Sequence, residues 1–182
     1  MTTPIITTRV ESGTWTIDPT HWTIGFSVRQ MGLATVRGHF TQFTGTLTIN
    51  DDGTTSVLVD IDIASIATGN DRRDRHLRSS AFFDAAAYPT ATFAVRGSAG
   101  PVGSTHQPAG EELTGDLTIK GVTTPAFLRI TPLAHNRAGA ILDDIDLCAR
   151  TTVRRSDFGV GSGGVVIGDS VAVDVTFRPV PS

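Results

Sequence analysis

The densest group of residues that could do chemistry lies between residues 71 and 78, where the sequence reads DRRDRHLR. A histidine beside a carboxylate can act as a general acid or base, because the unperturbed pKa of histidine is about 6.5. The arginines could instead bind a phosphate or another anionic head group. Opposite charges at three- and four-residue spacing stabilise a short helix, however, and the neighbouring carboxylates disfavour anion binding. We therefore favour a structural ion-pair network over a head-group site, with these members: Arg73, Asp74, His76, Arg78 and Asp84, joined by Arg155 and Asp157.

Patterns typical of other catalytic and metal sites are missing from the sequence. The histidines show no close pairing of the zinc-binding kind, and Cys148 is the only cysteine, so we expect neither an intrachain disulfide nor a cysteine-based metal cage. No GxSxG nucleophile motif occurs, and the glycine-rich run 159–168 lacks the spacing of a dinucleotide-binding loop. We expect no catalytic residue, no metal and no cofactor. An enzyme that uses His76 or His21 with Asp74 as acid and base is the alternative.

Charge and hydropathy narrow the function classes. The 182 residues carry a formal net charge of −3, which is not the basic footprint of a nucleic-acid-binding protein. No segment approaches the roughly eighteen apolar residues of a membrane-spanning helix, and the first residues lack the apolar core of a signal peptide. We expect a cytoplasmic protein with no nucleic-acid partner and no integral membrane segment. The sequence leaves a homodimer open.

Most of the chain alternates with period two, with apolar side chains on one face of each strand and threonine or aspartate on the other. We expect a flexible tail over residues 1–12 and a single domain over residues 13–182, made of about eight strands. The longest expected strands cover residues 36–49 and 55–66. Long strands whose apolar faces must meet favour a tall antiparallel barrel over a sandwich.

The connection between residues 65 and 89 breaks this alternation. Its charged half predicts one or two helical turns, whereas Phe82 and Phe83 require burial. Pro89 ends any helix before the next strand begins. We interpret this connection as a latch whose aromatic end is held in the core of the barrel.

Four separated blocks of the sequence match one known pattern. They lie within residues 15–47, 65–93, 115–125 and 155–169, and include Trp15, Phe82-Phe83-Asp84, Tyr88-Pro89, Gly121-Val122-Thr123 and Asp157-Phe158-Gly159. Through these residues the chain resembles the YceI-like family of lipocalin-like, polyisoprenoid-binding proteins over about residues 14–178. Trp22 and Gln30 depart from the family pattern, which usually has a small residue and a histidine at these positions.

The resemblance implies an all-β fold, an extended eight-stranded antiparallel lipocalin-like β-barrel with a short helix in the 65–89 connection. It further implies non-enzymatic binding of an isoprenoid or other long apolar lipid, of quinone or polyprenyl type, in the barrel pore, as a carrier or reservoir. The residues expected to contact this ligand are Trp22, Ile24, Phe26, Val28, Met31, Phe40, Phe43, Leu47, Phe82, Phe83, Phe93, Leu117, Ile119, Leu128 and Phe158.

Judged by the residues alone, the same side chains could fill a solid core, because small closed barrels are usually filled. The protein would then be a scaffold that holds no ligand. Trp22 is the strongest argument for this alternative, because a tryptophan that projects into the barrel occupies volume that a ligand would otherwise use.

Overall fold

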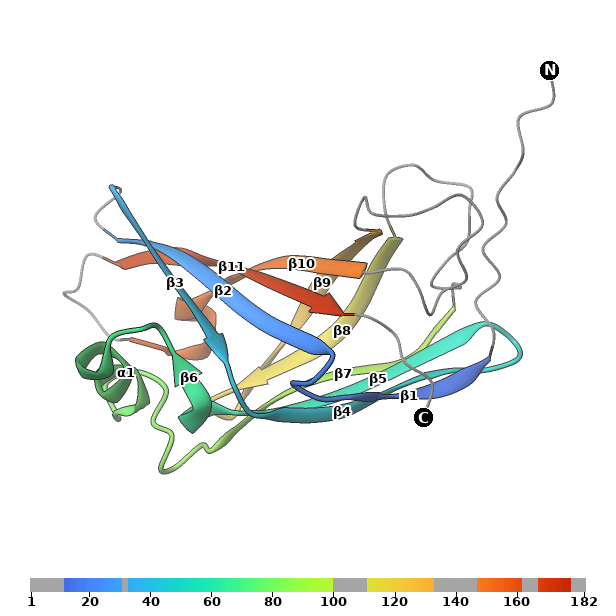
Figure 1. Cartoon of the computed structure of the whole chain (residues 1–182), viewed down its shortest axis with the longest axis horizontal. Coiled ribbons are helices and arrows are strands. Elements are labelled where there is room, and N and C mark those ends of the chain that lie inside the picture. The colour runs from blue at the N-terminus through green and yellow to red at the C-terminus, as the bar shows by residue number, and fades with distance from the viewer. Residues whose placement is uncertain (1–11, 31–32, 100–110, 133–146, 162–166, 178–182) are drawn as a thin grey trace, which may run out of the picture.

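The computed structural model describes residues 12–30, 33–99, 111–132, 147–161 and 167–177. Within these residues, eleven strands form one curled antiparallel sheet, accompanied by one α-helix and two 3-10 helices (Figure 1). The predicted all-β antiparallel fold and the helix between residues 65 and 89 are confirmed. In chain order the elements are β1 (Gly13–Ile17), β2 (Trp22–Gln30), β3 (Ala34–Phe40), β4 (Phe43–Ile49), β5 (Thr54–Asp62), η1 (Ile63–Ser65), β6 (Ile66–Ala67), α1 (Asp71–Arg78), β7 (Thr90–Ala99), β8 (Glu111–Ile119), β9 (Val122–Pro132), β10 (Leu147–Arg154), η3 (Arg155–Phe158) and β11 (Ile167–Phe177).

Three segments in the first part of the chain contribute to both ends of this sheet. The strand order is β1-β4-β5-β7-β8-β9-β10-β11-β2-β3-β6. β1 leads into β2, β3 leads into β4, and η1 alone separates β5 from β6. Each pair therefore acts as one bent strand that links the two ends of the sheet and curls it into a barrel (Figure 1). The predicted count of eight strands is wrong because these three bends divide three segments, and eleven strands less three continuations give eight.

Local hydrogen bonds explain why the single strand predicted over residues 55–66 bends after Asp62. The Asp62 carboxylate accepts a hydrogen bond from the Ala64 backbone N–H at 2.9 Å, and the Ser65 hydroxyl donates to the Asp62 carbonyl at 2.7 Å. Such side-chain bonds offer the backbone an alternative to the sheet ladder. The bend between β3 and β4 is tied to this one, because the Thr41 N–H donates to the Ser65 carbonyl and the Asp62 N–H to the Gln42 carbonyl.

Apolar side chains of the described residues gather in two clusters. The larger one fills part of the barrel with inward-facing residues such as Trp15, Leu47 and Leu147. The smaller one joins the connection after α1 to η3 and contains Phe82, Phe158 and Val160. The sequence predicted burial of both Phe82 and Phe83. Phe82 is buried, whereas Phe83 is half-buried.

Helix α1 forms where the charge spacing predicted it. The Asn70 side chain caps its start by accepting a hydrogen bond from the Arg73 backbone N–H at 3.0 Å. Its end is marked by Ser79, whose hydroxyl donates to the His76 carbonyl at 2.6 Å. Figure 1 shows α1 at the same end of the barrel as the last residues of β2 and the first of β3. No helix in the described part of the chain is long and apolar enough to cross a membrane.

Gly45 marks a point where β4 and β5 approach so closely that no side chain fits. A Cβ atom there would overlap the Leu58 carbonyl and lie 2.9 Å from the Val59 Cα. We expect Gly45→Ala to lower the free energy of unfolding by about 1–3 kcal/mol, because the backbone must shift. Thermal unfolding measures this loss as a decrease in Tm of roughly 2–4 °C for each kcal/mol. In the matched control Gly25→Ala the nearest atoms lie 3.6 Å away, so an equal loss in both variants would contradict the steric explanation.

Candidate functional site

An apolar cavity of about 280 Å³ lies inside the barrel. All eleven strands contribute inward-facing side chains to its wall, and η1, α1, η3 and the connections that follow α1 and η3 contribute the remainder. Among the described residues that line it, only five other than Trp22 carry polar or charged groups, and none is acidic: Gln30, Arg73, His76, Thr151 and Arg155. A lining of this kind holds a ligand through burial of apolar surface.

The two ends of the cavity differ in chemistry. Along β2 and β11 the paired positions run from Trp22 opposite Phe177 to Gln30 opposite Ile167. At the first end the Trp22 and Phe177 rings stack, with centroids 4.0 Å apart and an interplanar angle of 6°. η3 follows the end of β10 that lies away from this stack. α1 lies near η3, because the His76 ring of α1 contacts Phe82, and Phe82 packs in one cluster with Phe158 of η3. The charged lining residues therefore lie at the second end of the cavity.

Asp74 organises the charged residues of α1 through hydrogen bonds to Thr68. The carboxylate is only 6% exposed and accepts hydrogen bonds from the Thr68 hydroxyl at 2.5 Å and the Thr68 backbone N–H at 3.1 Å. Arg73 donates to the hydroxyl and the carbonyl of the same threonine at 2.7 and 2.9 Å. Burial raises the pKa of Asp74, but the bonds from Thr68 and the charges of Arg78 and Arg73 outweigh burial and hold this pKa below its usual range.

The ion-pair network predicted for this cluster is wrong in form, because hydrogen bonds connect its members. Within the described residues Asp74 makes no ion pair with an arginine at 4.0 Å or less, because Thr68 lies between the charged groups. Arg78 donates to the Ile66 carbonyl at 3.1 Å instead. Asp84 lies in the following turn with a φ of 52°, outside the network.

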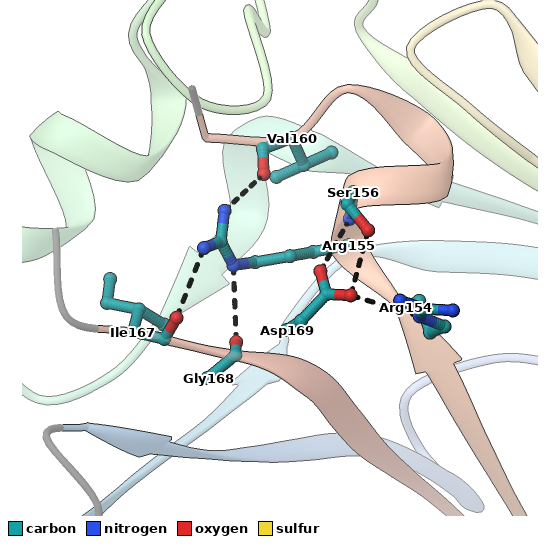
Figure 2. Close-up of polar contacts among 7 residues, drawn as sticks. All are labelled: Arg154, Arg155, Ser156, Val160, Ile167, Gly168 and Asp169. Carbon is teal, nitrogen blue, oxygen red and sulfur yellow. Dashed lines mark hydrogen bonds and ion pairs between the residues drawn. The ribbon is translucent and has the colours of Figure 1, made fainter. Parts of the chain in front are cut away.

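Arg155 ties η3 to the start of β11, as Figure 2 shows. Its guanidinium donates to the carbonyl oxygens of Val160 at 2.9 Å, Gly161 at 2.7 Å, Ile167 at 3.1 Å and Gly168 at 3.2 Å. The half-buried guanidinium of Arg155 is thereby hydrogen-bonded to backbone carbonyls. The sequence instead predicted an ion-pair network between Arg155 and carboxylates such as Asp157.

Asp169 makes a second tie on the same two elements (Figure 2). It accepts hydrogen bonds from the Ser156 N–H at 3.0 Å, the Ser156 hydroxyl at 2.8 Å and Arg154 Nε at 3.0 Å. The bonds from Ser156 and Arg154 lower the pKa of Asp169. Together, Arg155 and Asp169 fix the wall of the cavity where its charged end begins.

The acid–base pair considered as an alternative is not assembled. His76 is exposed and packs its ring against Phe82, with centroids 4.9 Å apart, while the oxygens of Asp74 face Thr68. His21 lies 3.7 Å from Asp18, but His21 is exposed, Asp18 is half-buried and neither lines the cavity. Over the described ranges, no three potential metal ligands form a group.

Comparison with known proteins assigns this arrangement to a family. A family model for the YceI-like domain matches residues 15–178, which covers every strand but the first residues of β1. The chain belongs to the YceI-like family. This confirms the resemblance found in the sequence blocks and supports an apolar ligand in the barrel.

Individual YceI-like relatives agree with this assignment. The chain is 36% identical to Protein YceI of Escherichia coli O6:H1 over 112 residues, which are 59% of this chain and 54% of that protein, so it spans about half the length of that relative. It is 28% identical to a UPF0312 protein of Pseudomonas syringae pv. tomato over 172 residues, covering 88% of this chain and 81% of the relative.

Solved structures show the same fold at low sequence identity. Burkholderia cenocepacia BcnA superimposes with a TM-score of 0.70 at 21% identity, covering 88% of this chain and 97% of that one. A polyisoprenoid binding domain from Saccharophagus degradans superimposes with a TM-score of 0.61 at 16% identity, covering 94% of this chain and all of that one.

The YceI-like barrel brings most of the predicted ligand-contacting residues to one cavity. Twelve of the fifteen line it: Trp22, Ile24, Phe26, Val28, Phe40, Leu47, Phe82, Phe83, Phe93, Leu117, Ile119 and Leu128. Phe43 and Phe158 are buried in the two apolar clusters but do not line the cavity. Met31 lies outside the described residues. Contact of these residues with a ligand stays a prediction.

Sequence reasoning missed much of the cavity wall. The omitted residues include β-branched side chains of β5, β10 and β11 and one aromatic residue: Val57, Val59, Ile61, Val153, Val171, Val173, Val175 and Phe177. Nearly all follow the period-two alternation that was recognised in their strands. That pattern could have identified them, since it places residues of one parity on the inner face.

We expect Asp74→Asn to lower stability at neutral pH by roughly 1–3 kcal/mol, because an amide replaces the buried acceptor of two Thr68 bonds. The pKa of Asp74 is depressed in the folded state, so its contribution is complete above the unfolded-state pKa of about 3.9 and is lost as the pH falls through the folded-state pKa. The difference in Tm from the wild type should therefore shrink below about pH 4. Asp71→Asn, on the exposed side of the same helix, is the control, and a pH-independent difference would refute this account.

We expect Arg155→Lys to destabilise the protein by about 1.5–3 kcal/mol, because an ammonium group cannot reach four carbonyls in different directions. Arg154→Lys is a matched neighbour whose exposed ion pair with Asp169 is worth at most about 1 kcal/mol. Chemical denaturation of both variants provides the measurement. Equal losses would show that the guanidinium contacts of Arg155 are not what holds η3.

Proposed function

We propose that this YceI-like protein binds an isoprenoid or comparable long apolar lipid, of quinone or polyprenyl type, as a carrier or reservoir. The observation that carries the proposal is a continuous apolar cavity with charged groups at one end only. That arrangement suits a molecule with an apolar chain and a more polar head. Family membership and the Saccharophagus degradans polyisoprenoid binding domain support binding rather than catalysis. The cytoplasmic location stays a prediction.

The energetics of the cavity favour such a ligand. Burial of apolar surface contributes about 25 cal/mol per Å², and only the part exceeding the cost of association appears as affinity. Half-buried valines of β11, such as Val171 and Val173, present apolar surface to the cavity. A bound apolar chain would remove that surface from water, so affinity requires no charged contact.

The test is to purify the protein under native conditions from an isoprenoid-producing host and to extract it for mass spectrometry. We expect an apolar lipid close to one molecule per chain. After removal of that lipid, the C15 alcohol farnesol should bind in equilibrium dialysis. A protein that carries no lipid and takes up no farnesol would contradict the proposal.

Two tryptophan substitutions locate the binding site. Val173→Trp places a large ring in the cavity and should weaken farnesol binding at least tenfold by occupying the ligand's volume. Thr176→Trp adds the same ring on the exposed face of the same strand and should leave binding unchanged. Equal affinities in the two variants, with both folded by circular dichroism, would place the ligand elsewhere.

A further inference from the structure

One aromatic pair closes the first end of the cavity, opposite the end that carries the charged residues. Trp22 and Phe177 lie directly opposite each other on β2 and β11, and their rings stack almost in parallel. The two residues are 8% and 6% exposed, although both line the cavity. Each therefore presents one surface to the cavity and is covered on its others.

Buried apolar side chains that do not line the cavity lie behind this pair. Leu147 pairs with Phe177 across β10 and β11, and Trp15, Ile49 and Val95 are buried in the same cluster. None of these four residues lines the cavity. The Trp22–Phe177 stack is thus the floor of the cavity, and a chain that enters from the charged end cannot extend beyond it.

The volume above this floor limits the length of the chain. The cavity measures about 280 Å³, roughly twice the ~150 Å³ of an engineered apolar cavity that holds the six carbons of benzene. The same proportion gives about eleven carbon atoms, or two to three isoprene units. A longer chain would have to leave its remainder outside the barrel.

We propose that the Trp22–Phe177 stack sets the maximum chain length, so that the protein discriminates among apolar chains at about two to three isoprene units. This inference rests on the proposed function and adds the specificity of the same site. Within the limit, each further buried methylene strengthens binding about fourfold. Beyond it, added units find no apolar surface and leave affinity unchanged.

Equilibrium dialysis with prenyl alcohols of two, three, four and five isoprene units tests the limit. For the wild type we expect affinity to rise from two to three units and then to stay level. Trp22→Ala vacates the volume of the indole ring at the floor and should extend the rise to four units, with at least a tenfold gain for that alcohol over the wild type. Trp22→Phe retains an aromatic floor and should keep the original limit.

Two further variants separate a length limit from general damage to the cavity. Val175→Trp fills the layer next to the stack and should shorten the limit by about one unit, the opposite direction to Trp22→Ala. Phe83→Ala removes a lining side chain at the charged end and should weaken all the alcohols without moving the limit. Unfolding curves identify any variant that fails to fold, and Phe177→Ala then replaces Trp22→Ala.

The outcomes distinguish this inference from the proposed function. If the wild type binds prenyl alcohols but Trp22→Ala, Phe177→Ala and Val175→Trp all keep its limit, the length limit set by the stack is wrong and lipid binding stands. If affinity rises through five units in the wild type, the floor does not limit the chain. If no alcohol binds to the wild type or any variant, the proposed function itself is wrong.

Discussion

The barrel depends on the bends that divide three of its strand segments. A sheet with two free edges would leave backbone groups unpaired and one apolar face exposed to water. Here β1–β2, β3–β4 and β5–η1–β6 run from one end of the sheet to the other, so the chain itself joins the ends. The hydrogen bonds of Asp62 and Ser65 fix one bend, and backbone bonds to Thr41 and Gln42 couple it to the next.

The distribution of side-chain volume along this barrel decides where it is hollow. Tryptophan, phenylalanine and leucine meet at one end and form the cluster that includes Trp15, Trp22 and Phe177. Toward the other end, β10 and β11 line the cavity with shorter side chains such as Thr151, Val171 and Val173. Many members of the cluster, such as Leu47 and Phe177, also line the cavity, so the packed core and the cavity wall share side chains.

The charged residues at the cavity end are chiefly engaged in holding the structure together. Asp74 and Arg73 both form hydrogen bonds with Thr68, and Arg155 donates hydrogen bonds to four backbone carbonyls. A rigid rim of this kind keeps polar backbone satisfied beside an apolar cavity, where unpaired groups would be costly. The recognition of an apolar chain then falls to the shape of the cavity rather than to these charges.

The amino-acid sequence by itself determined the fold class, the inward face of most strands and the position of the helix. Apolar and polar residues alternate in runs such as 171–177, and a strand places such residues on opposite faces. The charges in 71–78 are spaced three and four residues apart, and a helix places such residues on one face. Both patterns are local, so the sequence alone predicts the structure that follows. Motif blocks spread along the chain are also sufficient to indicate the YceI-like family.

Only the tertiary structure decided that three strand segments bend and that Thr68 rather than an arginine is the partner of Asp74. It also decided that Phe43 and Phe158 belong to the core, whereas Val57 and Val173 line a cavity. It also brought Trp22 and Phe177, from opposite parts of the chain, into one stack. The physical reason is that filled and empty volume depend on side chains from strands far apart in sequence, whereas alternation within one strand reports only which face is apolar.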